Sequence, residues 1–223
     1  MSKTLQFVRL DFLTIKPYFT MKNILIFALT PLILMYYIGG ASVANGIFMT
    51  YALTYVSYPF VLGEQCNIDA LYAALSIPRR TVVLGRYLFA LIFDVCAGFV
   101  SCIYSFVTAK LLGKGFSASE SIIVVIALLL TFSFFQIIQI PIYFKLGYAK
   151  AKMLANMPFL VLAALLVISS SVFGSGAYRY VLSAIYWMER HQALTALVGV
   201  SLWFGLLYLS YRLSVVYYSK RDF

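Results

Sequence analysis

Six long apolar stretches dominate this sequence and leave few folds open to it. They cover residues 23–39, 46–63, 87–112, 121–144, 155–173 and 193–213. Each is close to the roughly 20 residues that a helix needs to cross the hydrocarbon core of a bilayer. Only 11% of the residues are charged and 63% are hydrophobic, so lipid has to solvate much of the surface. The sequence therefore predicts a single all-α membrane domain over residues 1–223 with six transmembrane helices.

The distribution of lysine and arginine predicts the orientation of these helices. Thirteen of the 17 basic residues lie before the first stretch, in the second and fourth connections, or at the C-terminal end. The other four lie in the third and fifth connections. Basic residues gather on the cytoplasmic side of membrane proteins. We therefore expect this chain in the plasma membrane, with both termini in the cytoplasm. The net charge of +10 does not indicate a nucleic-acid partner, since the basic residues form no contiguous tract.

Two segments outside the apolar stretches are predicted to lie at membrane surfaces. Residues 1–20 alternate bulky and charged side chains, which is typical of a helix lying in the cytoplasmic interface, and Pro17 should end it. Its apolar members are Leu5, Phe7, Val8, Phe12 and Ile15, and its charged members are Lys3, Arg9, Asp11 and Lys16. Residues 174–192 carry Tyr178, Tyr180, Tyr186 and Trp187, an aromatic set typical of the outer interface.

The longest cytoplasmic connection, residues 64–86, is predicted to contain a short helix. Asn67 is a suitable N-cap, and Asp69 suits the positive start of a helix. The face of this helix carries Leu71, Ala74 and Leu75, and Pro78 prevents its continuation. The connection also holds Glu64, Arg79 and Arg80. The two arginines are interpreted as topology determinants and lipid-phosphate contacts, or alternatively as residues that dock a partner.

Motifs for nucleotide binding, metal binding and nucleophilic catalysis are missing from the sequence. The segment around Lys114 lacks the glycine and hydroxyl residues of a phosphate-binding loop. The only histidine, His191, has no second histidine or cysteine at metal-ligand spacing. We therefore expect no cofactor in this chain and no enzymatic activity of its own.

Asp94 is the one carboxylate well inside an apolar stretch. Because the third and fourth spans should be antiparallel, Asp94 is expected at the same depth as Gln136 and Gln139. We hypothesise that Asp94 is hydrogen-bonded to one of these glutamines across a helix pair. The bond could be a structural staple, or Asp94 could serve the translocation path or proton coupling.

The second connection resembles the permeases of type-2 ABC exporters, closest to the small Gram-positive group that includes the phenol-soluble modulin exporter permeases. In that group, a Glu follows the second span, then an Asn/Asp-bearing helix, a Leu-Pro-(Ile/Val)-Ser-Arg-Lys motif and a basic-Tyr pair. The matching residues here are Glu64, Asn67, Asp69, Leu75, Ile77, Arg79, Arg80, Val82, Val83, Arg86 and Tyr87. Ser76 and Pro78 depart from the pattern, as though serine and proline had changed places.

The resemblance implies that residues 64–80 couple the chain to a separate ATPase subunit. It makes Glu64, Asn67, Asp69 and Arg79 candidate ATPase-facing residues, and the helix pattern adds Leu71 and Leu75. ATP and Mg²⁺ would then bind to the partner ATPase. A second permease chain, identical or related, would complete the transporter. The expected cargo is an amphipathic peptide or a hydrophobic compound, because the spans are apolar and aromatic.

Two other classes of function compete with this interpretation. An ATP-independent secondary transporter or channel is one, although the six stretches show no repeats and no charge rings. A membrane scaffold or chaperone for another complex is the other. The loop at residues 64–80 discriminates between them, because an exporter permease needs it as a docking element and a channel should tolerate its loss.

Overall fold

A computed structural model describes residues 3–38, 42–75, 77–113, 115–172, 183, 186 and 190–221. The regular elements within these residues are helical. They are α1 (Lys3–Ile15), the 3-10 helix η1 (Lys16–Tyr18), α2 (Met21–Ile38), α3 (Ser42–Gln65), α4 (Ile68–Ala74), α5 (Arg79–Leu111), α6 (Ala118–Leu146), α7 (Tyr148–Val172) and α9 (Gln192–Ser219). Most of the predicted outer segment 174–192 lies outside the described residues.

The all-helical prediction is confirmed, and a long helix occupies each of the six predicted stretches. These helices are α2, α3, α5, α6, α7 and α9. By length and composition, α5, α6 and α9 could each cross a membrane, and a fourth span is possible if α1 and α2 together form one. That α2, α3 and α7 also cross the bilayer, each by itself, stays a prediction.

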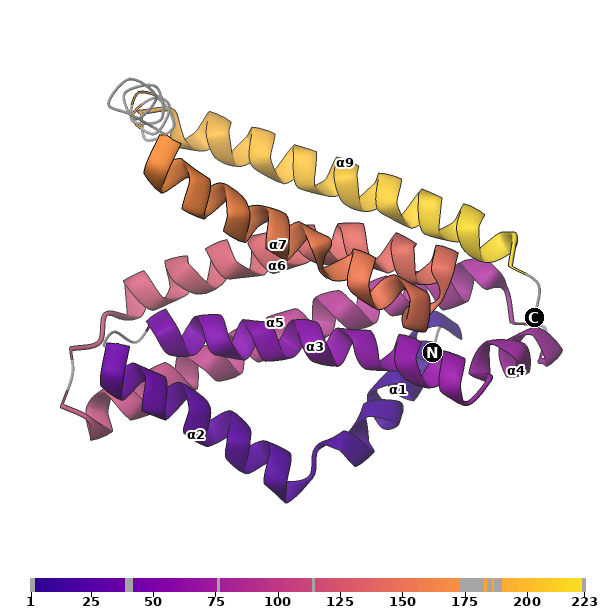
Figure 1. The fold of residues 1–223 in the computed structure, drawn as a ribbon, viewed down its shortest axis with the longest axis horizontal. Helices are drawn as coiled ribbons and strands as arrows, with labels where there is room; N and C mark the ends of the chain where they lie inside the picture. The colour runs from indigo at the N-terminus through magenta and orange to yellow at the C-terminus, as the bar shows by residue number, and fades with distance from the viewer. Residues whose placement is uncertain are drawn as a thin grey trace.

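The helices form an elongated bundle in which α5 is central (Figure 1). α5 packs against α1, α3, α6 and α9, while α7 packs mainly against α6. Both termini and α4 lie at one end, which we call the terminal end (Figure 1). The end of α2, the start of α3, the end of α5 and the start of α6 lie at the opposite end. The segments predicted to be cytoplasmic therefore gather at the terminal end.

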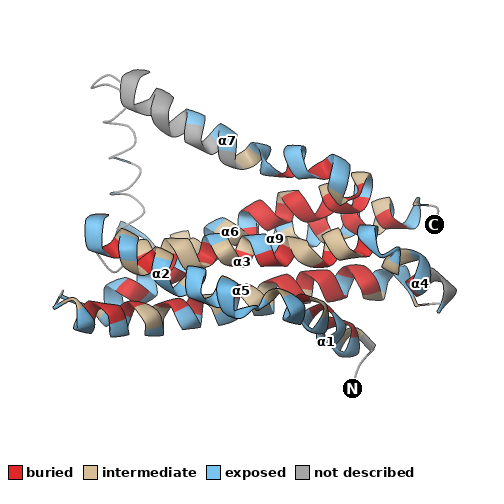
Figure 2. Cartoon of the chain, turned by 60° about the horizontal axis from the view of Figure 1, so that its bottom comes forward, coloured by how far each residue is buried: buried red, intermediate tan, exposed pale blue. Residues whose placement is uncertain are grey.

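The main core lies toward the terminal end, where buried residues are concentrated in Figure 2. Its largest members come from α1, α3, α4, α5, α6 and α9: Phe7, Ile15, Tyr55, Tyr72, Tyr87, Phe89, Ile140, Phe144 and Tyr218. Lipid tails are as apolar as these side chains, so close packing and polar contacts between helices have to stabilise the bundle. The aromatic rings supply that packing through many edge-on contacts.

The N-terminal helix α1 is amphipathic, as predicted, but its buried face differs in part from the predicted one. Phe7, Val8, Asp11 and Ile15 are buried at helical spacing, whereas Leu5 and Phe12 are exposed. α1 ends at Ile15, two residues before Pro17, and η1 follows it. The chain then turns by 85° into α2. The bend separates α1 from α2, and the place of α1 in the cytoplasmic interface stays a prediction.

A glycine allows α1 to approach α5 closely. A Cβ atom at Gly85 would lie only 2.4 Å from Cδ1 of the Phe7 ring. The absence of a side chain at this position lets Phe7 pack directly on the backbone of α5. The sequence of α5 therefore fixes where α1 lies.

Toward the opposite end, hydrogen bonds between small polar residues connect α2, α3 and α5. Ser105 donates to Asn45 Oδ1 at 2.7 Å, and Thr108 lies 3.3 Å from Met35 Sδ. All four residues are buried. Such contacts are effective in lipid because water does not compete for the polar groups.

Candidate functional site

The short helix α4 follows α3 and precedes α5 along the chain, and it lies at the terminal end of the bundle. Asn67 precedes it with a φ of 49°, a left-handed conformation that asparagine adopts more readily than most residues. The backbone carbonyl of Asn67 accepts the N–H groups of Ala70 and Leu71 at 3.1 and 3.3 Å, so that this residue starts the helix. Pro78 then precedes α5 and ends the connection.

One face of α4 is fixed to the bundle. Tyr72 is buried, and its ring meets that of Phe7 edge-on at a centroid distance of 5.0 Å. Burial raises the pKa of the Tyr72 hydroxyl, the nearby Arg86 opposing the shift. Ile68 packs beside Tyr72 against the same core. Sequence reasoning missed this inward face because it weighed only the leucine and alanine positions.

The other face of α4 points away from the bundle. The side chains of Leu71 and Leu75 are 55% and 62% exposed, and Asn67 and Ala70 are exposed as well. Two leucines this exposed on one short helix at the end of a bundle form an apolar surface without a partner in the described chain. A surface of this kind is typical of an interaction site.

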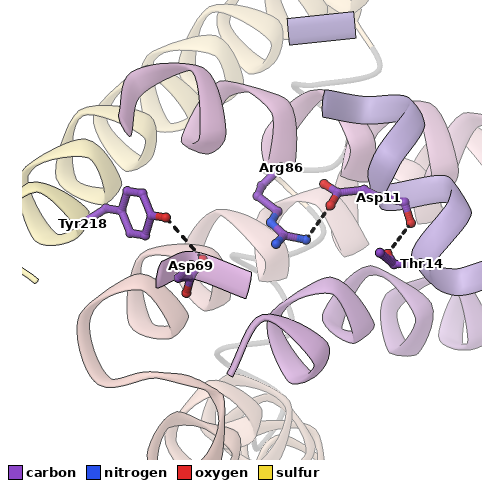
Figure 3. Close-up of polar contacts among 5 residues, drawn as sticks. All are labelled: Asp11, Thr14, Asp69, Arg86 and Tyr218. Carbon is purple, nitrogen blue, oxygen red and sulfur yellow. Dashed lines mark hydrogen bonds and ion pairs between the residues drawn. The ribbon is translucent and has the colours of Figure 1, made fainter. Parts of the chain in front are cut away.

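Asp69, predicted to face an ATPase, is turned toward the C-terminal helix. Its carboxylate accepts a hydrogen bond from the Tyr218 hydroxyl at 3.2 Å (Figure 3). The guanidinium of Arg221 lies 3.9 Å from the other carboxylate oxygen. Asp69 therefore connects α4 to the end of α9.

Glu64 and Arg79, which flank α4, also contact other helices. The Glu64 carboxylate accepts the backbone N–H of Ala149 at 2.9 Å, in the first turn of α7. An acidic group at this position compensates the positive end of the helix dipole. Arg79 donates to the backbone carbonyls of Tyr218 and Ser219, at the negative end of α9. Glu64 thus links the end of α3 to α7, and Arg79 links the start of α5 to α9.

The structure contains a buried ion pair that the sequence did not reveal. Arg86 Nη1 and Asp11 Oδ1 are 2.7 Å apart, and their side chains are 4% and 1% exposed (Figure 3). The guanidinium also lies near the rings of Phe7 and Phe60, at 5.5 and 5.1 Å from their centroids. The only sign of this ion pair in the sequence was Asp11, a carboxylate at a position on the apolar face of α1. Its partner is 75 residues away and could not be found from spacing.

The charged side chains of Asp11 on α1, Asp69 on α4 and Arg86 on α5 lie close together. A Cβ atom placed on Gly63 would lie 3.8 Å from both Arg86 Nη2 and the Asp69 carboxylate. Burial raises the pKa of Asp11 to about 6; Arg86 opposes this shift and the negative charge of Asp69 adds to it. Two carboxylates, Asp11 and Asp69, thus share the field of one arginine that cannot lose its charge.

The hydrogen bond predicted for Asp94 is present in the structure. Gln136 Nε2 donates to Asp94 Oδ1 at 3.0 Å, joining α5 to α6, and Asp94 is only 2% exposed. Gln139 instead donates to the backbone carbonyl of Ala155 on α7, also at 3.0 Å. No hydrogen-bond partner of Asp94 Oδ2 occurs among the described residues. Of the two candidate glutamines, Gln136 therefore links α6 to α5, and Gln139 links α6 to α7.

A second set of polar contacts joins α9 to α5 and α6, and sequence reasoning did not find it. The Tyr87 hydroxyl lies 2.9 Å from Ser214 Oγ, and Ser210 donates to the backbone carbonyl of Ile137 at 2.6 Å. Trp203 Nε1 donates to Ser133 Oγ at 3.0 Å. The spacing of residues 203, 210 and 214 could have indicated one polar face on α9.

No metal site is evident in the part of the chain that the structure describes, where no three His, Cys, Asp or Glu side chains gather. The features of this part are long apolar helices, buried polar cross-links and a short helix at one end that exposes leucines. Together they define a polytopic helical membrane protein.

The chain matches the family model described as ABC-2 family transporter protein over residues 6–219. It therefore belongs to this family, and it is a membrane transport subunit of the ABC type. Membership implies an ABC ATPase as a partner and counts against an ATP-independent channel. No curated protein and no solved structure matches the chain.

Proposed function

We propose that the chain is the permease subunit of an ATP-driven exporter, and that α4 is its docking element for the ATPase. The observation that carries this proposal is the division of α4 into two faces. Tyr72 and Asp69 fix one face to the bundle, while Leu71 and Leu75 expose the other. A helix that only closed a loop would gain nothing from two exposed leucines, whereas a docked ATPase would bury them.

The contacts of α4 support a route by which a docked ATPase moves the spans. A displacement of α4 acts on α1 through the Tyr72–Phe7 ring contact and on α9 through the Asp69–Tyr218 hydrogen bond. It acts on α7 through Glu64, which lies in the last turn of α3 and accepts a hydrogen bond from the first turn of α7. Binding and hydrolysis of ATP in the partner would thus reach several spans at once.

The proposed cargo is an amphipathic peptide or a hydrophobic compound that leaves the cell. An apolar cavity of about 210 Å³ between α2, α3, α5 and Phe19, the residue after η1, supports this class of cargo. Its aromatic lining consists of Phe19, Phe27, Phe48, Tyr51, Tyr55 and Phe93. Aromatic side chains offer large apolar contact areas without selecting a particular charge.

We further propose six spans, both termini in the cytoplasm, and a transporter built from two permease chains and two ATPase subunits. The concentration of basic residues in the segments at the terminal end supports this orientation. The motif of residues 64–87 supports a place in the small Gram-positive exporter group, with the plasma membrane as the location.

The first experiment is purification of the chain from its native membrane in a mild detergent, with mass spectrometry of the proteins that co-purify. We expect a stoichiometric protein that carries a phosphate-binding loop. Cross-linking through the exposed thiol of Cys66, next to α4, should join the two chains. Recovery of the chain without any such protein, even after cross-linking, would refute the proposal.

Variants then test the docking face itself. The double variant Leu71→Asp/Leu75→Asp should lose the ATPase, because an apolar interface does not accept two carboxylates. The matched control is Leu111→Asp, at a leucine that is 74% exposed at the other end of α5, and this variant should retain the ATPase. Retention of the ATPase by the double variant would place the docking site elsewhere.

A further inference from the structure

A second surface at the terminal end has a chemistry that the transport function does not explain. A groove of about 520 Å³ lies between the start of α5 and the end of α9. Three arginines line it, Arg79, Arg80 and Arg212, and none of its described lining residues is a carboxylate. Such a concentration of positive charge favours the binding of an anion.

Two of these arginines are available to a ligand. Arg80 and Arg212 are exposed, and neither forms an ion pair or a hydrogen bond with another described residue. Arg79 is held by the carbonyl groups at the end of α9, which fixes its position at the groove. The groove therefore presents guanidinium groups from two helices to the same space. Guanidinium groups bind phosphate oxygens with well-defined geometry.

Toward the middle of α9, beyond the basic groove, the exposed surface is apolar. Leu202, Leu206, Leu209 and Leu213 follow one another at spacings of three and four residues, and each is between 39% and 62% exposed. Next to them, an apolar groove of about 400 Å³ runs from Leu197 to Leu209. From Leu197 to Leu209 the helix rises by roughly 18 Å, comparable to half of the ~30 Å hydrocarbon core.

We propose that the α5–α9 groove binds an anionic phospholipid. Arg80 and Arg212, with Arg79 beside them, hold the phosphodiester of the headgroup, and an acyl chain lies along the leucines of α9. An acidic protein would satisfy the arginines but could not reach the apolar groove, which runs along a helix that can span the membrane. Only an amphipathic anion matches both parts. This site is separate from the exposed face of α4 and does not depend on the transport function.

The purified full-length chain allows a direct test in detergent by native mass spectrometry. The probes are dioleoylphosphatidylglycerol, dioleoylphosphatidylcholine and inorganic phosphate. The test variant is Arg80→Ala/Arg212→Ala. Its matched control is Lys150→Ala/Lys152→Ala, which removes two exposed positive charges near the start of α7. Both variants change exposed side chains, so the fold should be retained.

We expect the wild-type chain and the lysine control to bind phosphatidylglycerol in preference to phosphatidylcholine. A basic residue near a charged lipid contributes about fivefold in affinity, so the arginine variant should bind phosphatidylglycerol roughly 30-fold more weakly. Equal binding by the arginine variant and the lysine control would overturn the proposal, because general surface charge would then explain it. Displacement of the lipid by inorganic phosphate at the same concentration would exclude a role for the acyl chain. Unchanged lipid binding, with loss of a second permease chain or of an acidic protein, would assign the groove to that partner instead.

Discussion

The carboxyl group of Asp11 should make the stability of this protein depend on pH. This carboxyl lies in α1, outside the predicted spans, and its pKa is raised from 3.8 to about 6. The groups that face it are Arg86 from α5 and, further away, Asp69 and Tyr72 from α4. Because the pKa is higher in the folded chain than in the unfolded one, the folded chain binds the proton more tightly. The stabilising contribution of protonation is therefore complete below pH 3.8 and is lost as the pH rises through about 6.

The size of this effect follows from the two pKa values. A change from 3.8 to about 6 corresponds to about 3 kcal/mol in total, of which roughly half is lost between pH ~5 and pH ~8. For a chain of this length, the latter amounts to roughly 3–6 °C in melting temperature. Melting curves of the detergent-purified protein, followed by size-exclusion chromatography with fluorescence detection, can resolve such a difference.

Two substitutions make the assignment specific. Asp11→Asn, which resembles the protonated carboxyl, should remove this pH dependence and raise the melting temperature at pH ~8. Arg86→Met should move the transition to a higher pH, because the guanidinium now lowers the pKa of Asp11. Glu120→Gln, at an exposed carboxyl in the first turn of α6, is the control and should behave as the wild type. A wild-type curve without pH dependence in this range, or one that Asp11→Asn leaves unchanged, would refute the reasoning.

Three further substitutions test the packing of the bundle, each by melting temperature and by the amount of protein in the membrane. Gly85→Ala should cost about 1–3 kcal/mol because its methyl group would overlap the Phe7 ring, whereas Gly199→Ala, with open space around it, should be neutral; equal stability of the two variants would contradict this packing. Asp94→Leu should cost about 1–3 kcal/mol by leaving Gln136 without its acceptor, and Asp94→Asn should be tolerated. Loss of transport in Asp94→Asn at an unchanged protein level would instead give Asp94 a functional role. Ser105→Ala should cost a similar amount, since it removes the donor to the buried Asn45, and an unchanged melting temperature would show that this contact contributes nothing.

The fold could be predicted well from the sequence because lipid imposes a simple rule on each stretch separately. An apolar run of about 20 residues has to be a helix if its backbone is to be satisfied in the bilayer. The same local reasoning found the short helix after α3 and the hydrogen bond of Asp94, since antiparallel neighbours place residues of equal depth side by side. The amphipathic character of α1 was equally visible.

The contacts of the candidate site could not be predicted, because they join residues that are far apart in sequence. Asp11 and Arg86 looked like surface charges, yet they pair in the core. Asp69 appeared to face a partner, yet it accepts a hydrogen bond from Tyr218 at the other end of the chain. The contact between Asp11 and Arg86 depends on how α1 packs on α5. The contact between Asp69 and Tyr218 depends on how α9 packs. The roles of Glu64, Asn67, Asp69, Leu71, Leu75 and Arg79 in ATPase coupling stay predictions.

The attachment of α4 to the base of α9 has a mechanical consequence. α9 has 28 residues, so it is a rod of roughly 42 Å. If Asp69 and Arg79 tilted that rod by about 5° at its base, its far tip would move by roughly 4 Å, about the width of a methyl-bearing side chain. The helix would act as a lever arm that converts a small push at one membrane surface into an opening at the other. Stiffness along α9 would then matter as much to this protein as the strength of any single contact.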